Sequence, residues 1–242
     1  LPPSQGHDGA ADRDHGELQG RFALVELTGL HWPTKGEFTM LFYDSPNPAP
    51  NPRRVRIFAA EKGIDLPSQE VSIPKREQKA PEYVAKNPRG QTPILELDDG
   101  TIIAESVAIM RYLEALNPEP PLFGTTAVER ALVDQWIRRV EFTVMTPVGM
   151  YWRHAHPLTA RLLKQNVEFG ESNREATAAA MRWFDRELEG REFILGGYFS
   201  AADIMALCVV DFAKFAGLDM PEDTPHLHAW HKRMSARPSA AA

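Results

Sequence analysis

The sequence predicts a small α/β unit followed by an all-α helical half, and three observations carry this prediction. Short apolar segments alternate with helical patterns up to residue 116. A proline-dense connector occupies residues 117–124. Beyond it the strand patterns disappear, and apolar residues recur only at helical spacing, which is typical of a helix bundle.

These changes of pattern divide the chain into four segments. They are a tail at 1–37, an α/β unit at 38–116, the connector at 117–124 and an all-α half at 125–242. The first segment shows little sustained periodicity, and the first methionine, Met40, stands just ahead of the first convincing strand. We therefore expect residues 1–37 to be a disordered tail or a cloning remnant.

The α/β unit is expected to open with a strand, a helix and a second strand. Residues 39–43 read as a short buried strand, followed by a proline-rich turn. Asn51 is a favoured N-cap, Pro52 suits the first helical position, and Gly63 ends the helix. Residues 69–73 predict a second strand, parallel to the first through a right-handed helical crossover.

The rest of this unit is expected to contain a short helix, a hairpin and another helix. The short helix is expected at 81–86, and the hairpin strands at 94–97 and 101–103 flank an Asp-Asp-Gly turn. A further helix begins where Glu105 and Ser106 follow the second hairpin strand.

Two features beside the hairpin could hold both ends of a small peptide. Thr92-Pro93 precedes the first strand, and a cis bond there would turn the Thr92 backbone outward to pair with an extended ligand. The helix start at Ser106 offers free N–H groups to a carboxylate, and Glu105 offers a negative charge to an ammonium. Each feature alone is compatible with a structural role, whereas the combination favours ligand binding.

The all-α half is expected to begin with a long helix and to contain a buried central one. Thr126 and Glu129 form a capping-box pattern at the start of the long helix. Ser200 and Asp203 form a second such pattern, and the helix after it is apolar on nearly all sides. The helical patterns after the first cover residues 158–168, 172–189, 201–216 and 225–236.

Composition and charge exclude several classes of protein. The chain has 242 residues, and 43% of them are hydrophobic, which suffices for sizeable cores. The net charge of −6 argues against nonspecific binding to nucleic acid or to an acidic membrane. No apolar run approaches the roughly 18 residues that span a bilayer, so we expect a soluble intracellular protein. The single cysteine, Cys208, excludes an internal disulfide and a cysteine-rich metal site, and we expect it to be inert core.

Four segments, taken in order, carry a resemblance to a known family. They read LFYDSPNPAPNPRRVRIFAAEKGI, NPRGQTPIL, ESVAIMRYL and FSAADIMAL, and together with the connector they span residues 39–242. In this combination the chain resembles the cytosolic glutathione transferases of bacterial type and is similar to their nu-like members. The resemblance implies a thioredoxin-like domain that binds glutathione, an all-α C-terminal domain, a homodimer, a cytoplasmic location and no metal.

Carried over position by position, the resemblance implies which residues bind glutathione. Thr92 and Pro93 match the pair whose backbone meets the cysteinyl unit. Glu105 and Ser106 match the residues that bind the γ-glutamyl end. The residues that fall near the glycine carboxylate are Gln78 and Gln91.

At the position from which family members activate the thiol, this sequence differs from the family pattern. Glutathione reacts as its thiolate, and a free thiol with a pKa of about 8.5 is little ionised at neutral pH. Family members place Tyr, Ser or Cys after the first strand, but the slot used by many Ser or Cys members here falls on Ala49. Asn51 is the nearest replacement, because its amide could donate to the sulfur and the helix N-terminus adds a positive field.

Other assignments remain beside this one. Asn51 alternatively serves only as a helix cap, and Ser45 or Tyr43 then activates the thiol. Arg53 and Arg54 could reinforce the anion, although arginines on a first helical turn are more often solvated.

The second substrate is expected to bind between the halves in an apolar, aromatic pocket, with His154 or His156 as polar handles. The predicted lining residues are Pro48, Met145, Tyr151 and Trp152. The leading hypothesis is an enzyme in which glutathione attacks a hydrophobic electrophile or reduces a peroxide or disulfide. The alternatives are a non-enzymatic ligand carrier or regulatory protein, which Ala49 favours, and a glutathione-dependent isomerase or ether-cleaving enzyme.

Overall fold

The computed structural model describes residues 40–242. The predicted tail at 1–37 and the first residue of the predicted first strand lie outside this range. The strands are β1 (Met40–Asp44), β2 (Ser68–Glu70), β3 (Ile94–Leu97) and β4 (Ile102–Ala104). The helices are α1 (Pro50–Glu61), α2 (Pro81–Lys86), α3 (Ser106–Leu116), α4 (Ala127–Arg139), α5 (Thr146–His154), α6 (Val167–Glu187), α7 (Ala201–Phe215) and α8 (Pro225–Ser235). Short turns of other helical types are η1 (Glu77–Lys79), η2 (Val140–Met145), η3 (Pro157–Thr159) and η4 (Pro238–Ala241).

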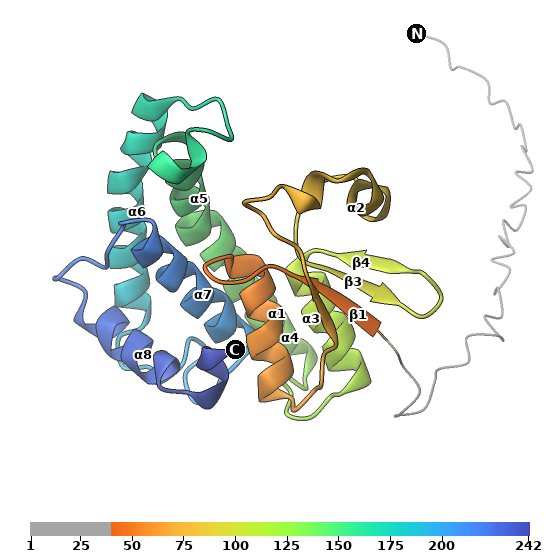
Figure 1. Ribbon diagram of the computed structural model, residues 1–242. Helices are drawn as coiled ribbons and strands as arrows, with labels where there is room; N and C mark the ends of the chain where they lie inside the picture. The colour runs from red at the N-terminus through yellow and green to blue at the C-terminus, as the bar shows by residue number, and fades with distance from the viewer. Residues whose placement is uncertain (1–39) are drawn as a thin grey trace, which may run out of the picture. The chain divides into compact units, whose positions relative to one another are not determined.

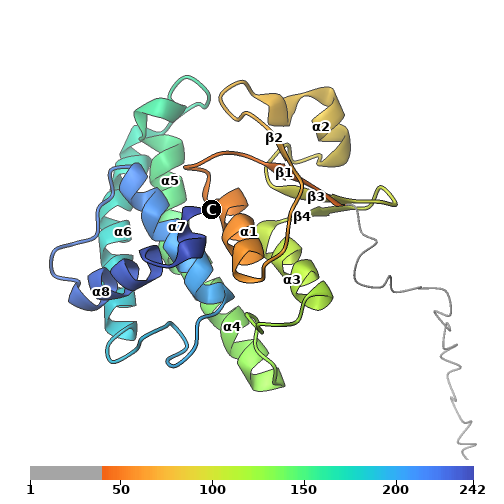
Figure 2. The same ribbon diagram turned by 60° about the horizontal axis from the view of Figure 1, so that its bottom comes forward.

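A four-stranded mixed sheet, in the order β2-β1-β3-β4, lies at the centre of the α/β part (Figures 1 and 2). β1 and β2 are parallel and are joined through α1, as predicted. β3 runs antiparallel to both β1 and β4, which confirms the predicted hairpin. β2 is shorter than the predicted 69–73, because pairing with β1 ends once β1 itself ends at Asp44.

The two faces of the sheet carry different helices. Successive side chains of a strand point to opposite faces, so Phe42 and Leu95 join the large core under α1 and α3, whereas Tyr43 and Ile94 join a smaller cluster with α2. Figure 1 shows α2 on the opposite side of the sheet from α1 and α3. Tyr43 is therefore directed toward α2 and away from α1.

The C-terminal helices surround α7, which is buried along nearly its whole length, as its apolar sequence predicts. Both predicted capping boxes are present, at the starts of α4 and α7. In the second box the Asp203 carboxylate is fully buried and accepts hydrogen bonds from Ser200, from the Ile194 N–H and from the Trp230 indole. This carboxylate connects the start of α7 to α8.

The prediction of a helix at 158–168 is wrong. The chain forms only the short turn η3 there, and α6 begins at Val167 because the Asn166 side chain caps it, accepting from the Phe169 N–H at 3.2 Å. The apolar side chains that suggested a helix, Leu158 and Leu162 among them, are instead 60% and 45% exposed.

Two predicted helix starts are also displaced by one or two residues. α1 begins at Pro50 with Ala49 as its N-cap, so Asn51 lies inside the first turn and is not the cap. α3 begins at Ser106 with Glu105 in the cap position, so Ser106 is not the cap either. Instead of capping its helix, the Ser106 hydroxyl accepts a hydrogen bond from Arg54 at 3.3 Å.

α1 connects the α/β part to the C-terminal helices. It packs against α3, against α7 and against the C-terminal turn η4. Val55 and Phe58 of α1 belong to the same continuous core as Met205 and Cys208 of α7. Among residues 40–242, none of the helices is long and apolar enough to cross a membrane.

Candidate functional site

The backbone edge at Thr92 is the first part of the site. The Thr92–Pro93 peptide bond is cis, and within residues 40–242 the Thr92 N–H and C=O have no hydrogen-bond partner. The turn before it is fixed, because the Tyr83 hydroxyl and the Asn87 amide donate to the Gln91 carbonyl at 2.9 and 2.7 Å. An extended ligand can pair with this open backbone as if it were an added strand.

The N-terminus of α3 forms the second part. The first intrahelical bond runs from the Ile109 N–H to the Glu105 carbonyl at 3.0 Å, so in the described part of the chain the N–H groups of Ser106 and of the next two residues are unpaired. The helix dipole makes this end positive. Glu105 has φ 71° and ψ 120°, a strained backbone for a residue with a side chain, and its carboxylate is 72% exposed. The open N–H groups of α3, which can bind a carboxylate, therefore begin one residue after Glu105, whose own carboxylate can bind an ammonium.

Gly90 lies close to the backbone of Gln78, one of the two glutamines predicted to bind the glycine carboxylate of glutathione. A Cβ on Gly90 would lie 2.8 Å from the Gln78 carbonyl oxygen, so only glycine fits. Exposed Gln91 accepts a hydrogen bond from Arg89 Nε at 3.0 Å, and the Gln78 side-chain oxygen is buried without a partner among residues 40–242. Neither side chain donates to another described residue, which leaves both amide N–H groups free for a carboxylate.

The first turn of α1 presents one free backbone donor. The prolines at positions 50 and 52 have no N–H, and the N–H groups of Ala49 and Arg53 are bonded within the turn. Of the residues in this turn, Asn51 alone keeps an N–H without a partner in the described chain, and its side-chain amide is likewise unpaired there. Asn51 therefore offers two hydrogen-bond donors, its backbone N–H and its side-chain amide, at the positive end of the α1 dipole.

Ser45 and Tyr43, the other predicted activating residues, have their hydroxyl groups engaged within the fold. Ser45 is 1% exposed, and its Oγ lies 2.8 Å from the Val71 carbonyl and 2.9 Å from Thr92 Oγ1. Because a hydroxyl has one proton, none remains for a thiol. Tyr43 donates to Glu96 at 2.6 Å on the α2 face of the sheet, and burial raises its pKa. Both geometries favour the α1 N-terminus as the activating group.

A cavity of about 220 Å³ lies beside the turn between β1 and α1. Its lining residues are Asn47, Pro48, Arg53, Cys208, Asp211 and Phe212. Pro48 was expected beside the second substrate, and it borders this cavity. Cys208 is 1% exposed, and burial raises its pKa to about 11, so the expectation of an unreactive thiol is confirmed.

The other predicted pocket residues lie next to the cavity or away from it. Met145 packs against the core, and the Tyr151 hydroxyl accepts a hydrogen bond from Arg174 at 2.6 Å. Trp152 meets the Phe212 ring edge-on at 5.2 Å between centroids, one side chain from the cavity. His156 packs on Trp152 at 4.4 Å, and burial lowers its pKa, which keeps it neutral near pH 7.

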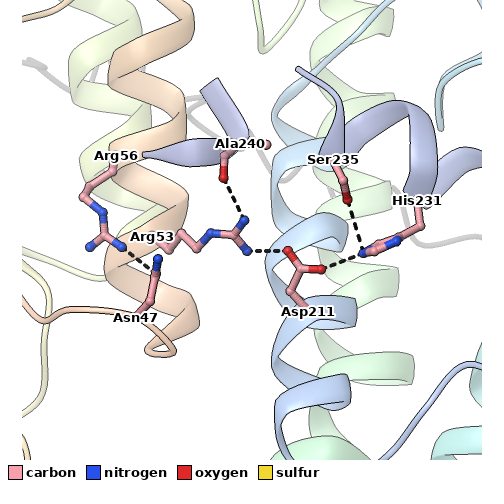
Figure 3. A network of polar contacts seen from close by, with 7 residues as sticks. All are labelled: Asn47, Arg53, Arg56, Asp211, His231, Ser235 and Ala240. Carbon is pink, nitrogen blue, oxygen red and sulfur yellow. Dashed lines mark hydrogen bonds and ion pairs between the residues drawn. The ribbon is translucent and has the colours of Figure 1, made fainter. Parts of the chain in front are cut away.

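A polar network that the sequence did not predict fixes α1 and contributes Arg53 and Asp211 to the lining of the cavity (Figure 3). The Arg53 guanidinium pairs with Asp211 of α7 at 2.5 Å and donates to the Ala240 carbonyl at 2.9 Å. His231 of α8 lies 2.6 Å from the other Asp211 oxygen. The expectation of solvated arginines on this turn is therefore wrong. No sequence signal joins Arg53 to a carboxylate so far along the chain.

No group of three or more His, Cys, Asp or Glu side chains that could hold a metal ion occurs within residues 40–242. The open groups described above are hydrogen-bond donors, one carboxylate and one backbone edge. Groups of these kinds are suited to binding a small charged peptide.

Comparisons with known proteins identify the family of the chain. Residues 49–116 match the family model for the glutathione S-transferase N-terminal domain, and residues 151–238 match the model for the C-terminal domain. Glutathione S-transferase 2 of Saccharomyces cerevisiae is 42% identical over 226 residues, which cover 92% of this chain and 95% of that protein.

Solved structures are similar over nearly their whole length. The crystal structure of Gtt2 from Saccharomyces cerevisiae has a TM-score of 0.77 and 39% identity, and the match covers 83% of this chain and 98% of that one. A glutathione S-transferase domain-containing protein of Marinobacter aquaeolei VT8 has a TM-score of 0.76 and 37% identity, with 82% and 98% covered. The chain belongs to the glutathione S-transferase family, and the fold class and transferase function expected from its sequence are confirmed.

Proposed function

We propose that the protein binds glutathione between the Thr92 edge and the N-terminus of α3, and that the N-terminus of α1 activates the thiol. The γ-glutamyl ammonium then meets Glu105, and its carboxylate meets Ser106 and the open N–H groups of α3. The cysteinyl backbone pairs with Thr92, and the glycine carboxylate meets Gln91 and Gln78. The observation that carries this proposal is the set of open backbone groups at Thr92 and in the first turn of α3, which lie beside the mostly exposed Glu105 carboxylate.

In the proposed reaction Asn51 replaces the usual side-chain hydroxyl. Its backbone N–H and side-chain amide donate to the sulfur, and hydrogen bonds to an ionised group are about twice as strong as neutral ones. The thiolate is thereby favoured over the thiol, so more of it is present at neutral pH. The cavity that Pro48 lines, beside the turn that leads into α1, supports attack of the thiolate on an electrophile held there.

The variant Asn51→Ala tests the activating role. We expect kcat to fall about 10-fold, because a donor to a charged group is lost, while the KM for glutathione changes less. The pH profile of kcat at saturating glutathione should move to higher pH, since the bound thiol becomes a weaker acid. The comparison variant Ser45→Ala should leave that profile in place. A profile that moves for Ser45→Ala and stays for Asn51→Ala would assign the role to Ser45.

The binding step has its own test. Calorimetry with wild-type protein should detect glutathione at millimolar concentration, and the absence of heat under those conditions would end the proposal. If glutathione binds but a panel of electrophiles and hydroperoxides gives no turnover, the protein is a carrier that has kept the site. The reduction of peroxides or disulfides and the cytoplasmic location stay predictions from the resemblance.

The homodimer is also part of the proposal. Val128 and Leu132 of α4 are 68% and 41% exposed, and residues four apart lie on one face of a helix. These two side chains give α4 an apolar face that a second copy of the chain can cover. Sedimentation should give twice the chain mass at micromolar concentration. A monomer at all concentrations would remove the dimer from the account.

A further inference from the structure

A second cavity, of about 310 Å³, lies between α8 and the connector at 188–200 that joins α6 to α7. Its volume is at the lower end of the roughly 300 to 1,000 Å³ that is typical of small-molecule sites. One wall is a single face of α8, because successive lining residues of this helix are three and four positions apart. The lining includes Gly190, Arg191, Glu192, His226, Ala229 and Arg233.

This cavity is separate from the proposed glutathione site. Its lining residues come from α8 and from the segment that follows α6, and none of them belongs to the sheet, to α1 or to α3. In both views α7 and α1 lie between α8 and the sheet (Figures 1 and 2). A ligand in this cavity can therefore be bound at the same time as glutathione.

Two exposed arginines line the cavity and have no carboxylate partner within residues 40–242. The Arg191 guanidinium donates to the Ile194 carbonyl at 3.0 Å and lies over the Trp136 ring, 5.6 Å from its centroid. The Arg233 guanidinium donates to the carbonyls of Arg191 and Glu192 at 3.2 and 3.0 Å. These carbonyls orient the two guanidiniums, but they carry no net charge and leave both positive charges uncompensated.

Other arginines of the chain are paired with carboxylates. Arg182 pairs with Asp223, and Arg237 pairs with Glu61, each at 2.8 Å. In Arg191 and Arg233, by contrast, one nitrogen makes all the hydrogen bonds, so Nε and one further nitrogen have no partner in the described part of the chain.

The open nitrogens of the two arginines suit an oxyanion. A guanidinium presents its donors as a planar fork that matches the oxygens of a phosphate. Two cations that share one cavity repel each other, and an anion bound between them removes this repulsion. A role limited to bonding the backbone carbonyls would use one nitrogen of each side chain and would not need both charges beside one empty volume.

The other two ionisable residues of the lining have opposite effects on an anion. The His226 ring makes no hydrogen bond to another described residue, so its nitrogens are open to a ligand. Glu192 is the one carboxylate in the lining, and its side chain has no ion-pair partner within residues 40–242. Two arginines outweigh this one glutamate, so the cavity is positive although the whole chain carries a net charge of −6.

We propose that this cavity is a second binding site and that it binds a phosphate group, either as free phosphate or as the end of a small monoester. Such a group carries about −1.5 to −2 charges at pH 7, which matches two guanidiniums. Arg191 and Arg233 bind its oxygens through their open nitrogens. The small residues Gly190 and Ala229 leave the space that the group occupies. The site shares no residue with the proposed glutathione site, so each can be tested without the other.

The test is a calorimetric titration of the wild-type protein, without glutathione, at an ionic strength held constant with sodium chloride. The two ligands are inorganic phosphate and phenyl phosphate, and at least one should bind to a single site. Tighter binding of phenyl phosphate identifies the ligand as a monoester, whereas equal or tighter binding of inorganic phosphate identifies free phosphate. The absence of heat from both at millimolar concentration overturns the proposal.

Four variants place the binding in this cavity. Arg191→Gln and Arg233→Gln should each weaken it by about 10-fold, because a charged donor is lost. Glu192→Gln should strengthen it by about 3-fold, because a repelling carboxylate is removed. Ala229→Leu fills the cavity without changing its charge and should abolish binding. The last two variants keep the bonds of both arginines to the backbone, so they test the site even if an arginine variant fails to fold.

Arg161→Gln is the matched control for net charge. Arg161 is exposed after η3, lies outside the cavity and has no partner within residues 40–242. Its loss changes the net charge as much as Arg191→Gln does and should leave the affinity unchanged. The proposal is overturned if Arg161→Gln and Arg191→Gln weaken binding equally, if Ala229→Leu binds as tightly as wild type, or if Glu192→Gln weakens binding.

Discussion

Replacing Asp203 with alanine is expected to lower the free energy of unfolding by about 3 to 5 kcal/mol. The carboxylate is fully buried and accepts from the Ile194 N–H at 2.9 Å, from Ser200 at 3.1 Å and from the Trp230 indole at 3.0 Å. Its removal leaves these donors buried and unpaired, and it also leaves a cavity at the start of α7. Chemical denaturation followed by tryptophan fluorescence measures the effect.

The comparison variant Ser200→Ala should cost only about 1 kcal/mol, because it removes one hydroxyl and keeps the carboxylate with its other donors. If both variants lower the free energy of unfolding by a similar amount, the stabilisation comes from the capping of α7 and not from the connection to α8. An unchanged denaturation midpoint for Asp203→Ala would contradict the account of the core.

Replacing Glu105 with glycine is expected to weaken glutathione binding by about 10- to 100-fold, because the ligand ammonium loses its carboxylate. The same change should keep the stability of the empty protein or raise it by up to about 1 kcal/mol. The reason is the backbone: φ of 71° with ψ of 120° is strained for glutamate and accessible to glycine. Calorimetry and thermal unfolding of the same sample provide both readouts.

Glu105→Ala separates the two effects at the same position. Alanine also lacks the carboxylate, but its Cβ keeps the backbone strain, so we expect the same loss of affinity without any gain in stability. If glycine and alanine destabilise the empty protein equally, the strain is not relieved and Glu105 has a structural role. If neither variant changes the affinity, the γ-glutamyl end binds elsewhere.

The elements that depend on local chemistry were predictable from the sequence. The hairpin of β3 and β4 follows from an Asp-Asp-Gly turn between alternating apolar residues, and α2 begins and ends as predicted. Both capping boxes were legible because the two residues that form each box lie three positions apart. Such features need no knowledge of the rest of the chain.

The features that depend on distant contacts were not predictable. The apolar residues after α5 suggested a helix at 158–168, but Leu158 and Leu162 are exposed there and only a short turn forms. The charges of Arg53 and Arg54 suggested solvated side chains, yet one pairs with Asp211 and the other is buried against Ser106. Both partners are remote in sequence, and no spacing rule joins them.

The candidate site divides in the same way. The residues around Thr92 and Ser106 could be chosen from the sequence, because a proline before a strand and the start of a helix are local signals. The activating residue depends on which face of the sheet a side chain occupies and on which donors are already used. Tyr43 and Ser45 could be weighed against Asn51 only when their hydrogen bonds to Glu96 and Val71 were known.

The most direct measurement of the central claim is a crystal structure of the wild-type protein with glutathione bound. The account predicts the sulfur within hydrogen-bonding distance of the Asn51 N–H or side-chain amide, with the γ-glutamyl carboxylate at the N-terminus of α3. A sulfur that is hydrogen-bonded to Ser45 or Tyr43, or a tripeptide that lies away from Thr92 and Ser106, would contradict it.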